Sequence, residues 1–409
     1  MKVLIVNFDF PPNQGIGGRR WAKLAKGLAA RGVEVFVIKA DPVKFNVESP
    51  WYSDVLSPNI HIHSLPRLYP ESVSHPRSGV LSKLRYIADM QGLRKYKEGT
   101  IYDIALRWEK MFLQKATQLI SSESIIHVAA TGAPFNLLYY TAKLRDLFPG
   151  LRILADYRDP WLTARNYGMP SLSPDMFEKE RQKQQLVFDL ADVITAPYPK
   201  LLEIMMHEDV RRNEHHTKFK LLPHFFDETD IPSERPKPLD NKIKLVYGGA
   251  LYMDSEESLN HLATAMLKNP SIGDREIEVS IYTDSRIPDS ELFGMKNVKV
   301  RKGIGKAIFS EIRNADLCLL FMATHNCHFL TTKIMEYLPL RTPFLYLGPK
   351  GEVANFIVGN RLGYCPENLL IEWPAIMRQV DEGNPGFNLN YDYGQHSLNA
   401  VSQRLLDIF

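Results

Sequence analysis

The sequence predicts an α/β protein with two doubly wound domains, each built on a parallel sheet. Residues 1–38 contain an apolar strand, a loop rich in glycine and proline, an amphipathic helix over about 19–31, and a second strand. The same plan returns at residues 242–283, where Gly248 and Gly249 follow the first strand. Continuous apolar strands suit a parallel sheet that is covered on both faces. Two such openings therefore predict two doubly wound domains, with ligands at the carboxyl ends of both sheets.

Length and composition agree with this prediction. The chain has 409 residues, of which 44% are hydrophobic and 24% charged, as in ordinary globular proteins. This length allows two or three domains, each with its own core. The apolar runs are too short to span a bilayer, and polar Asn7 and Asp9 stand where a signal peptide would be apolar. We therefore expect a cytoplasmic protein, with its three cysteines as reduced thiols.

Charge is distributed unequally between the two halves. Residues 1–228 carry 31 Lys and Arg against 25 Asp and Glu, a net charge of +6, while residues 229–409 carry 19 against 22, a net charge of −3. A basic first domain favours an anionic partner such as a lipid-linked phosphate or the inner face of the cell membrane, and we expect no nucleic-acid partner. Basic residues over 83–99 alternate with Tyr86, Met90 and Tyr96, as in a peripheral membrane helix. An ordinary solvated surface, or a helix lying on the core, explains these patterns as well.

In chain order, residues 39–80 are rich in Pro, Ser and His and are expected to form a long loop. The other elements expected in the first domain are helices over 81–90, 101–121, 135–147 and 174–191, and strands over 125–130, 152–156, 193–196 and 220–223. Residues 227–241, DETDIPSERPKPLDN, predict a linker because proline and charge dominate.

The domains are therefore expected at residues 1–228 and 229–409, and the last helix is free to pack back on the first domain. After the repeated unit, the second domain is expected to contain strands over 298–300, 316–322 and 343–347. Its expected helices span 306–314, 331–340, 369–381 and 397–408, and a further helix begins at residue 352.

Four loops that follow strands are candidates for the chemistry. The first, residues 10–20, places three glycines before a helix, so exposed backbone N–H groups and the helix dipole suit a phosphate or a sugar hydroxyl. Arg19 and Arg20 add positive charge. The glycines at 15–17 begin a GxGxxG fingerprint, but Arg20 replaces its last glycine and no acidic residue marks a ribose site, which disfavours a nicotinamide cofactor. A structural tight turn is nearly as plausible.

The second loop, residues 156–161, follows a strand, and Pro160 prevents regular helix there. Arg158 could bind a phosphate or keep Asp159 ionised, and Asp159 could accept a proton or a hydrogen bond from a hydroxyl. An internal salt bridge that caps the next segment explains the same residues equally well.

The third loop contains Gly248 and Gly249, where the backbone can approach a ligand. Acidic residues follow at the start of the next helix, where the helix dipole explains them without a ligand.

The fourth loop begins a helix with Thr331 and Thr332 and places Lys333 one helical turn before Glu336. This spacing lets Lys333 meet a diphosphate while the Glu336 carboxylate receives two hydroxyls of a ribose. A capping threonine followed by an ordinary ion pair along the helix is an equally good explanation.

Five segments of the chain, taken together, resemble glycosyltransferases of the GT-B fold, of the family 4 type that assembles polysaccharide and lipopolysaccharide. They are FPPNQGIGGRRWAKLAKGLAARGVEVFVI, TGAPF, LADYRDPW, LVYGGALY and TTKIMEYLPLRTPFLYLGPKGEVANFI. The resemblance implies two Rossmann-like domains facing a cleft, with a UDP- or GDP-linked sugar held mainly by the second and the acceptor by the first. It also implies a hexosyltransferase that retains anomeric configuration, needs no metal, and uses a hydroxyl of a glycan or lipid-linked acceptor.

The resemblance assigns roles to several residues. It implies that Glu336 binds ribose, that Gly17 and Gly18 approach the donor phosphates and the transferred sugar, and that Gly248 and Gly249 open the donor domain. Donor binding is thus expected from Gly17, Gly18, Arg19, Gly248, Gly249, Thr331, Thr332 and Glu336, and catalysis from Arg158, Asp159 and Lys333.

The chain departs from the family pattern at three positions. His328 stands where the family has a second glutamate, Ala250 where an arginine is common, and Arg341 where a glycine is common. With that arginine absent, Lys333 and the arginine pair of the first loop become the candidates for the diphosphate. A non-catalytic sugar-nucleotide-binding protein and a sugar-nucleotide epimerase of the same fold are therefore the alternatives.

Overall fold

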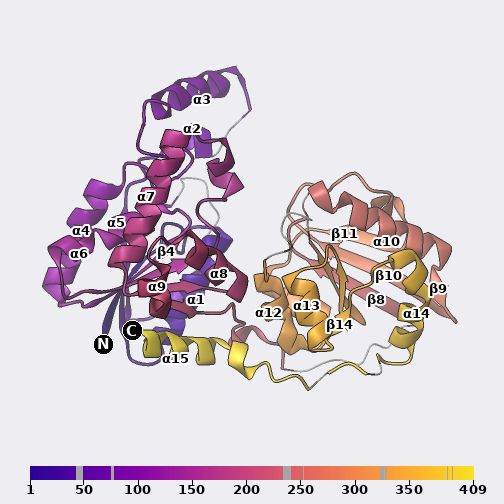
Figure 1. Cartoon of the computed structure of the whole chain (residues 1–409). Helices are drawn as coiled ribbons and strands as arrows, with labels where there is room; N and C mark the ends of the chain where they lie inside the picture. Colours follow the sequence, from indigo (N-terminus) through magenta and orange to yellow (C-terminus); the bar gives the residue numbers. More distant parts are fainter. Residues whose placement is uncertain are drawn as a thin grey trace. The chain divides into compact units, whose positions relative to one another are not determined.

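The computed structural model in Figure 1 describes residues 1–42, 49–74, 78–233, 241–251, 253–322, 327, 329–384, 386–388 and 390–409, apart from the side chains of Ile16 and Met253. Contacts divide the chain into two compact units. The first unit comprises Met1–Pro223 and Leu398–Phe409, and the second comprises His224–Ser397. Each unit has helices packed on a mostly parallel sheet, which confirms the predicted α/β class with two doubly wound domains.

The first sheet has the strand order β3-β2-β1-β4-β5-β6-β7, and every pairing along it is parallel. Its strands are β1 (Lys2–Val6), β2 (Glu34–Ala40), β3 (Ile60–Leu65), β4 (His127–Gly132), β5 (Arg152–Tyr157), β6 (Val193–Ala196) and β7 (Phe219–Leu221). Because β1 pairs with β2 on one side and β4 on the other, the strand order reverses there. In a doubly wound sheet the carboxyl ends at this reversal are where ligands bind.

The helices of the first unit come from both ends of the chain. They are α1 (Ile16–Ala29), α2 (Glu71–Ser74), α3 (Val80–Leu93), α4 (Glu109–Glu123), α5 (Asn136–Ala142), α6 (Leu144–Leu147), α7 (Pro174–Leu190), α8 (Pro199–Glu208), α9 (Arg212–His215) and α15 (Leu398–Ile408). Helix α15 lies beside α1, with Val401 and Leu405 fully buried, so the end of the chain is part of this unit. Among the described residues, no helix is both long and apolar enough to cross a bilayer.

Two expectations for the first unit were wrong. Residues 39–80 were expected to form a loop, yet β3 (Ile60–Leu65) lies there at the sheet edge. Its alternate residues are His61 and His63, whose rings stack on Phe36 of β2, so the strand lacks the apolar run that signals a buried one. The helix expected over 101–121 begins only at Glu109, since the turns before it are held by the carboxylate of Asp103.

The second sheet has the strand order β11-β10-β8-β12-β13-β14, again with parallel pairings. Its strands are β8 (Lys242–Gly248), β10 (Arg275–Tyr282), β11 (Val298–Arg301), β12 (Leu317–Phe321), β13 (Phe344–Leu347) and β14 (Gly363–Tyr364), and the short β9 (Ser271–Ile272) pairs antiparallel with β10. The covering helices are α10 (Glu256–Lys268), α11 (Ile308–Arg313), α12 (Thr332–Tyr337), α13 (Glu352–Gly359) and α14 (Leu369–Asp381).

Both faces of the second sheet are buried, which explains its continuous apolar strands. Leu245 and Leu319 belong to one core cluster, and the neighbouring Val246 and Leu320 belong to another. Because successive side chains of a strand point to opposite faces, helices cover the sheet on both sides.

The change of unit falls just before the predicted linker, residues 227–241. The second unit begins at His224, and residues 234–240 of the expected segment lie outside the described residues. Its first residues are ordered by Asp227, whose carboxylate accepts hydrogen bonds from the backbone N–H and the hydroxyl of Thr229 at 2.9 and 2.7 Å.

Candidate functional site

In the second unit, the loop after β8 is held by two tyrosines. The phenol of Tyr247 donates to the carbonyl oxygen of Ala250 at 2.5 Å, and that of Tyr337 donates to the carbonyl oxygen of Gly248 at 3.1 Å. Gly249 has φ of +133°, a conformation that favours glycine, and its N–H donates to Tyr282 at 2.9 Å. The loop is therefore a preformed tight turn at the carboxyl end of the strand.

Lys333 lies against this turn. Its amine donates to the Tyr247 phenol at 2.9 Å and stands 4.7 Å from the centroid of that ring. A Cβ atom on Gly249 would overlap the same amine. Burial raises the pKa of Tyr247, so the phenol stays neutral and acts as an acceptor for the lysine. The structure thus brings together two predicted site residues, Gly249 and Lys333, that lie far apart in the sequence.

The other predicted donor residues of this unit flank the lysine. Thr331 has extended backbone just before α12, and its side chain makes no capping hydrogen bond, so the capping explanation does not hold for it. Thr332 begins the helix, and Glu336 follows Lys333 by one turn, so both side chains lie on adjacent positions of one helical face. These side chains are partly exposed. His328 lies outside the described residues.

In the first unit, the predicted glycine loop packs against the protein itself. Helix α1 begins at Ile16 rather than near Arg19, so Gly17 and Gly18 form its first turn. A Cβ atom on Gly18 would overlap the carbonyl oxygen of Asp9, and one on Gly17 would lie 2.8 Å from a guanidinium nitrogen of Arg158. These glycines therefore allow close packing, and their contact with donor phosphates stays a prediction.

The two arginines of this loop are tied into the fold. Arg20 is only 6% exposed and forms an ion pair with Asp156, Nε to Oδ2 being 3.1 Å. It also donates to the carbonyl oxygens of Leu222 and Pro223 at 2.6 and 3.0 Å. The prediction that Arg20 binds the diphosphate is therefore wrong, because the Arg20 charge is neutralised by Asp156 in the core. Arg19 is also buried, with its guanidinium 5.5 Å from the Trp51 ring centroid.

Arg158 and Asp159 stand at the end of β5 and are partly exposed. Arg158 donates to the carbonyl oxygens of Gly132 and Ala133 at 3.3 and 2.5 Å, so backbone at the end of β4 holds its guanidinium. The Asp159 carboxylate has no hydrogen bond within the part of the chain that the structure describes. Burial raises the pKa of Asp159, and the Arg158 charge lowers it less strongly, so Arg158 favours the ionised carboxylate but does not offset the effect of burial.

An internal salt bridge does exist in this loop, but it joins Asp156 to Arg20 of α1. Asp156 pairs with Arg20 and also accepts hydrogen bonds from Trp21 and Thr195, both at 2.8 Å. The structure therefore separates the acidic pair of the loop into a buried structural residue and the partly exposed Asp159.

Sequence reasoning missed the two tyrosines of the second unit. Tyr247 ends a buried strand and Tyr337 occupies a core position of a helix, so both follow apolar periodicity. Only their hydroxyl groups distinguish them from other core aromatics, and a buried tyrosine usually has a hydrogen-bond partner. From that rule, the sequence could have predicted that the two hydroxyl groups form hydrogen bonds with the neighbouring glycine turn.

No protein-family model matches the chain, and no curated protein matches its sequence. Solved structures match it over essentially its whole length. A sucrose-phosphate synthase from Thermosynechococcus elongatus has 12% identity and a TM-score of 0.63, covering 100% of this chain and 98% of its own. "WaaG, a glycosyltransferase involved in lipopolysaccharide biosynthesis" has 14% identity and a TM-score of 0.58, covering 99% of both chains. This chain has the GT-B fold.

A third solved structure with this fold contains a nucleotide sugar. The structure "Trehalose-6-phosphate from E. coli bound with UDP-2-fluoro glucose" has 11% identity and a TM-score of 0.60, covering 100% of this chain and 99% of its own. At such identities the likeness describes architecture, so activity has to be argued from the residues.

Proposed function

We propose that this protein is a glycosyltransferase that moves a sugar from a nucleotide diphosphate sugar to a hydroxyl of a glycan or lipid-linked acceptor. The observation that carries the proposal is the amine of Lys333 lying against the Gly249 turn at the carboxyl end of β8. Doubly wound sheets bind nucleotides at this edge. The GT-B fold shared with WaaG and with a structure holding a UDP sugar supports the same activity.

The second unit is proposed to hold the donor. In the transfer, the bond between the anomeric carbon and a diphosphate oxygen breaks, the acceptor oxygen bonds to that carbon, and the hydroxyl proton leaves. Negative charge develops on the departing UDP or GDP, and the partly buried Lys333 stabilises it there. Glu336 accepts the two ribose hydroxyls, and the hydroxyls of Thr331 and Thr332 supply further donors. Because Lys333 supplies this positive charge, we propose that transfer needs no metal. We also propose that it retains anomeric configuration, as the resemblance to family 4 implies.

The first unit is proposed to hold the acceptor. Arg158 has a guanidinium oriented by two backbone carbonyls, with further N–H groups to offer an anionic or hydroxylated ligand. Asp159 has a raised pKa, which makes it a better proton acceptor than an ordinary aspartate, and we assign it to the acceptor hydroxyl.

A turnover assay with UDP- and GDP-linked sugars and extracted lipid-linked acceptors tests the proposal. A glycosyltransferase forms a glycosylated acceptor and free nucleoside diphosphate, and NMR of the product gives the anomeric configuration. Nucleotide binding without turnover would instead support the non-catalytic alternative. Conversion of the sugar nucleotide without an acceptor would support the epimerase.

We further propose that the first unit contacts an anionic membrane surface through α3, which would place the protein at the inner face of the cell membrane. Val80, Leu81, Leu84 and Ile87 are 77%, 83%, 58% and 44% exposed and lie on one helical face by their spacing. Lys83 and Arg85 are also exposed, and their positions border that face. Figure 1 shows α3 beyond α2 at the margin of the unit. An exposed apolar face with basic borders is typical of an interfacial helix.

Vesicle sedimentation tests this contact. The L81E/L84E variant is expected to bind vesicles rich in phosphatidylglycerol at least about tenfold less than the unmodified chain, because it removes apolar burial and adds repulsion. The matched control is I371E, which changes a residue of α14 that is 75% exposed. Equal binding by L81E/L84E would contradict the membrane assignment and leave the transferase proposal standing.

A further inference from the structure

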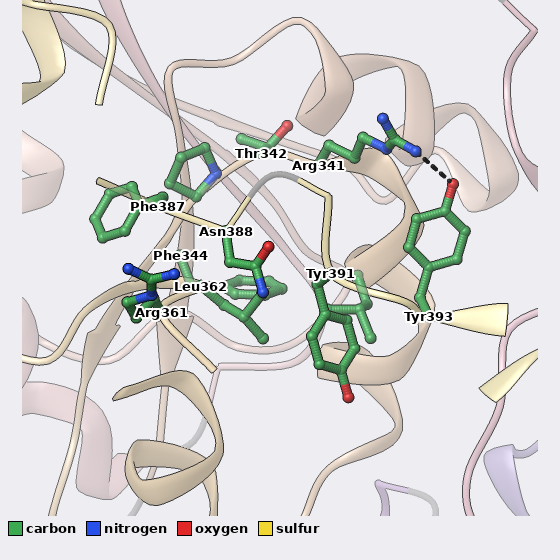
Figure 2. A pocket seen from close by; sticks show the side chains of 11 residues that line it. Arg341, Thr342, Phe344, Arg361, Leu362, Phe387, Asn388, Tyr391 and Tyr393 are labelled. Atoms are coloured by element: carbon green, nitrogen blue, oxygen red, sulfur yellow. Dashed lines mark hydrogen bonds between the residues drawn. The ribbon is translucent and has the colours of Figure 1, made fainter. Parts of the chain in front are cut away.

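We propose that the second unit carries an additional ligand site, for a small ring compound with a phosphate group, at the amino ends of β13 and β14. Figure 2 shows the pocket, whose polar lining comes from Arg341, Thr342, Arg361, Asn388, Tyr391 and Tyr393. Arg341 precedes β13 and Arg361 precedes β14. Because the strands are parallel, these ends lie at the sheet edge opposite the turn that Lys333 contacts. The pocket is therefore separate from the proposed donor site.

Positive charge in this pocket has no acidic counterpart among the lining residues. The Arg361 guanidinium makes no hydrogen bond, ion pair or ring contact with any residue that the structure describes. Arg341 donates to the Tyr393 phenol at 3.3 Å and stands 5.5 Å from that ring centroid, and this partner is neutral. The exposed Asp392 lies between the tyrosines in sequence but does not line the pocket. Both arginines are exposed, and a guanidinium group without a carboxylate partner suits a phosphate, which it binds bidentately.

Both arginines occupy backbone positions that favour glycine. Arg341 has φ of +58° and Arg361 has φ of +53°, in the left-handed region. Arg361 follows Asn360, the C-cap of α13, at the position where glycine is preferred, and Arg341 is the C-cap of the 3₁₀ turn Leu338–Leu340. Within the described residues only five non-glycine positions have positive φ, and two of them line this one pocket. Because a left-handed backbone is retained at two positions that line one pocket, we infer that their side chains are used.

The rest of the lining fits the ring of the ligand. Asn388 is partly buried, its side-chain amide has no hydrogen bond within the described chain, and Figure 2 draws it between Arg361 and the Arg341–Tyr393 pair. Its backbone N–H donates to the Arg361 carbonyl at 2.8 Å, which fixes the amide beside that arginine. The Tyr391 ring packs edge-on against Phe356, 6.1 Å between centroids. An open amide beside aromatic rings suits the hydroxyls and apolar face of a sugar, or a nucleobase.

Calorimetric titration of the full chain with glucose 6-phosphate, UDP and inorganic phosphate tests the site. At least one ring phosphate is expected to bind the K333A background, and R341G and R361G in that background are each expected to weaken it at least tenfold. The tighter of the two ring probes distinguishes a sugar phosphate from a nucleotide. Equal affinity for inorganic phosphate would overturn the ring assignment, and unchanged affinity in both arginine variants would overturn the site. If the transferase assay showed no turnover, the proposed function would fail, but the outcome of this titration would still decide whether the additional site exists.

The stability of the same variants provides the control for misfolding. R341G and R361G are expected to unfold at temperatures no lower than the unmodified chain, because glycine relieves the left-handed backbone. R378G, the same substitution on the exposed face of α14, is expected to unfold at a lower temperature, because glycine weakens a helix interior. Loss of binding together with a lower unfolding temperature in R341G and R361G would overturn the assignment, since the arginines would then be structural.

Discussion

The two βαβ openings look alike in sequence but use their cations differently. In the first unit, Arg20 is buried and neutralised by Asp156 of β5. In the second, Lys333 is partly exposed and donates to the neutral phenol of Tyr247 beside the Gly249 turn. A glycine turn near a cation is therefore not enough to mark a ligand site. What distinguishes the first opening is that Asp156 of β5, two strands from β1 in the sheet, carries a carboxylate into the core beside Arg20.

The largest expected effect comes from breaking the buried pair of the first unit. D156N leaves the Arg20 charge without its counterion and should destabilise this unit by about 3 kcal/mol, the cost typical of an uncompensated buried charge. Denaturant unfolding followed by tryptophan fluorescence measures it, since Trp21 donates to the same carboxylate. A loss near zero would show that the two openings differ less than the structure indicates.

In the second unit, G249A should both destabilise the turn and weaken nucleotide binding. The added Cβ meets the Lys333 amine, and the φ of +133° is strained for alanine, a cost of about 1–3 kcal/mol. Chemical unfolding and UDP or GDP titration measure the two effects. G359A is the matched control, since nothing lies within 4 Å of its added atom. Equal behaviour of the two variants would argue against a constrained turn.

Removing the lysine tests the charge itself. K333A should lower the transfer rate at least about tenfold, or roughly 1.4 kcal/mol, because the departing diphosphate loses its cation. K350A, which removes a side chain that is 82% exposed and paired with Glu367, should keep the rate. A folded K333A protein with an unchanged rate would exclude Lys333 from the site. Equal rates of the unmodified chain with and without EDTA would support the metal-independent proposal.

The smallest expected effect is on the pH profile. Asp159 accepts a proton only when it is ionised, and burial raises its pKa. As the pH is lowered, Asp159 should therefore become protonated, and activity should fall, at a higher pH than for an aspartate with an ordinary pKa. D159N removes the ionisable group and should flatten this acid limb while lowering the rate. Rate measurements across the acidic range check it, and an identical acid limb in D159N would contradict the assignment.

The sequence was sufficient for the repeated architecture because buried parallel strands are continuous apolar runs. Strand β6 lies at the predicted residues 193–196. The sequence was insufficient for β3, because histidines in this edge strand interrupt the apolar pattern that indicates a strand. It was also insufficient for the start of α1, because glycines form the first helical turn. Both failures arise because tertiary packing overrides local propensity.

For the site, residue type and strand position predicted which residues to consider but not their partners. Lys333 meets the Gly249 turn only because the parallel sheet brings the ends of β8 and β12 to one edge. Arg20 loses its predicted role because Asp156 lies beside it on β5, two strands from β1, which no local spacing reveals. The roles of Arg158 and Asp159 in transfer, and of Glu336 in ribose binding, stay predictions.

Hydrogen–deuterium exchange of the full chain with and without UDP or GDP tests the central claim most directly. Residues 247–251 and 331–337 should exchange more slowly with nucleotide present, and K333A should lose this protection. Nucleotide binding that leaves both segments unprotected, or that protects K333A equally, would contradict the assignment of the donor to this turn.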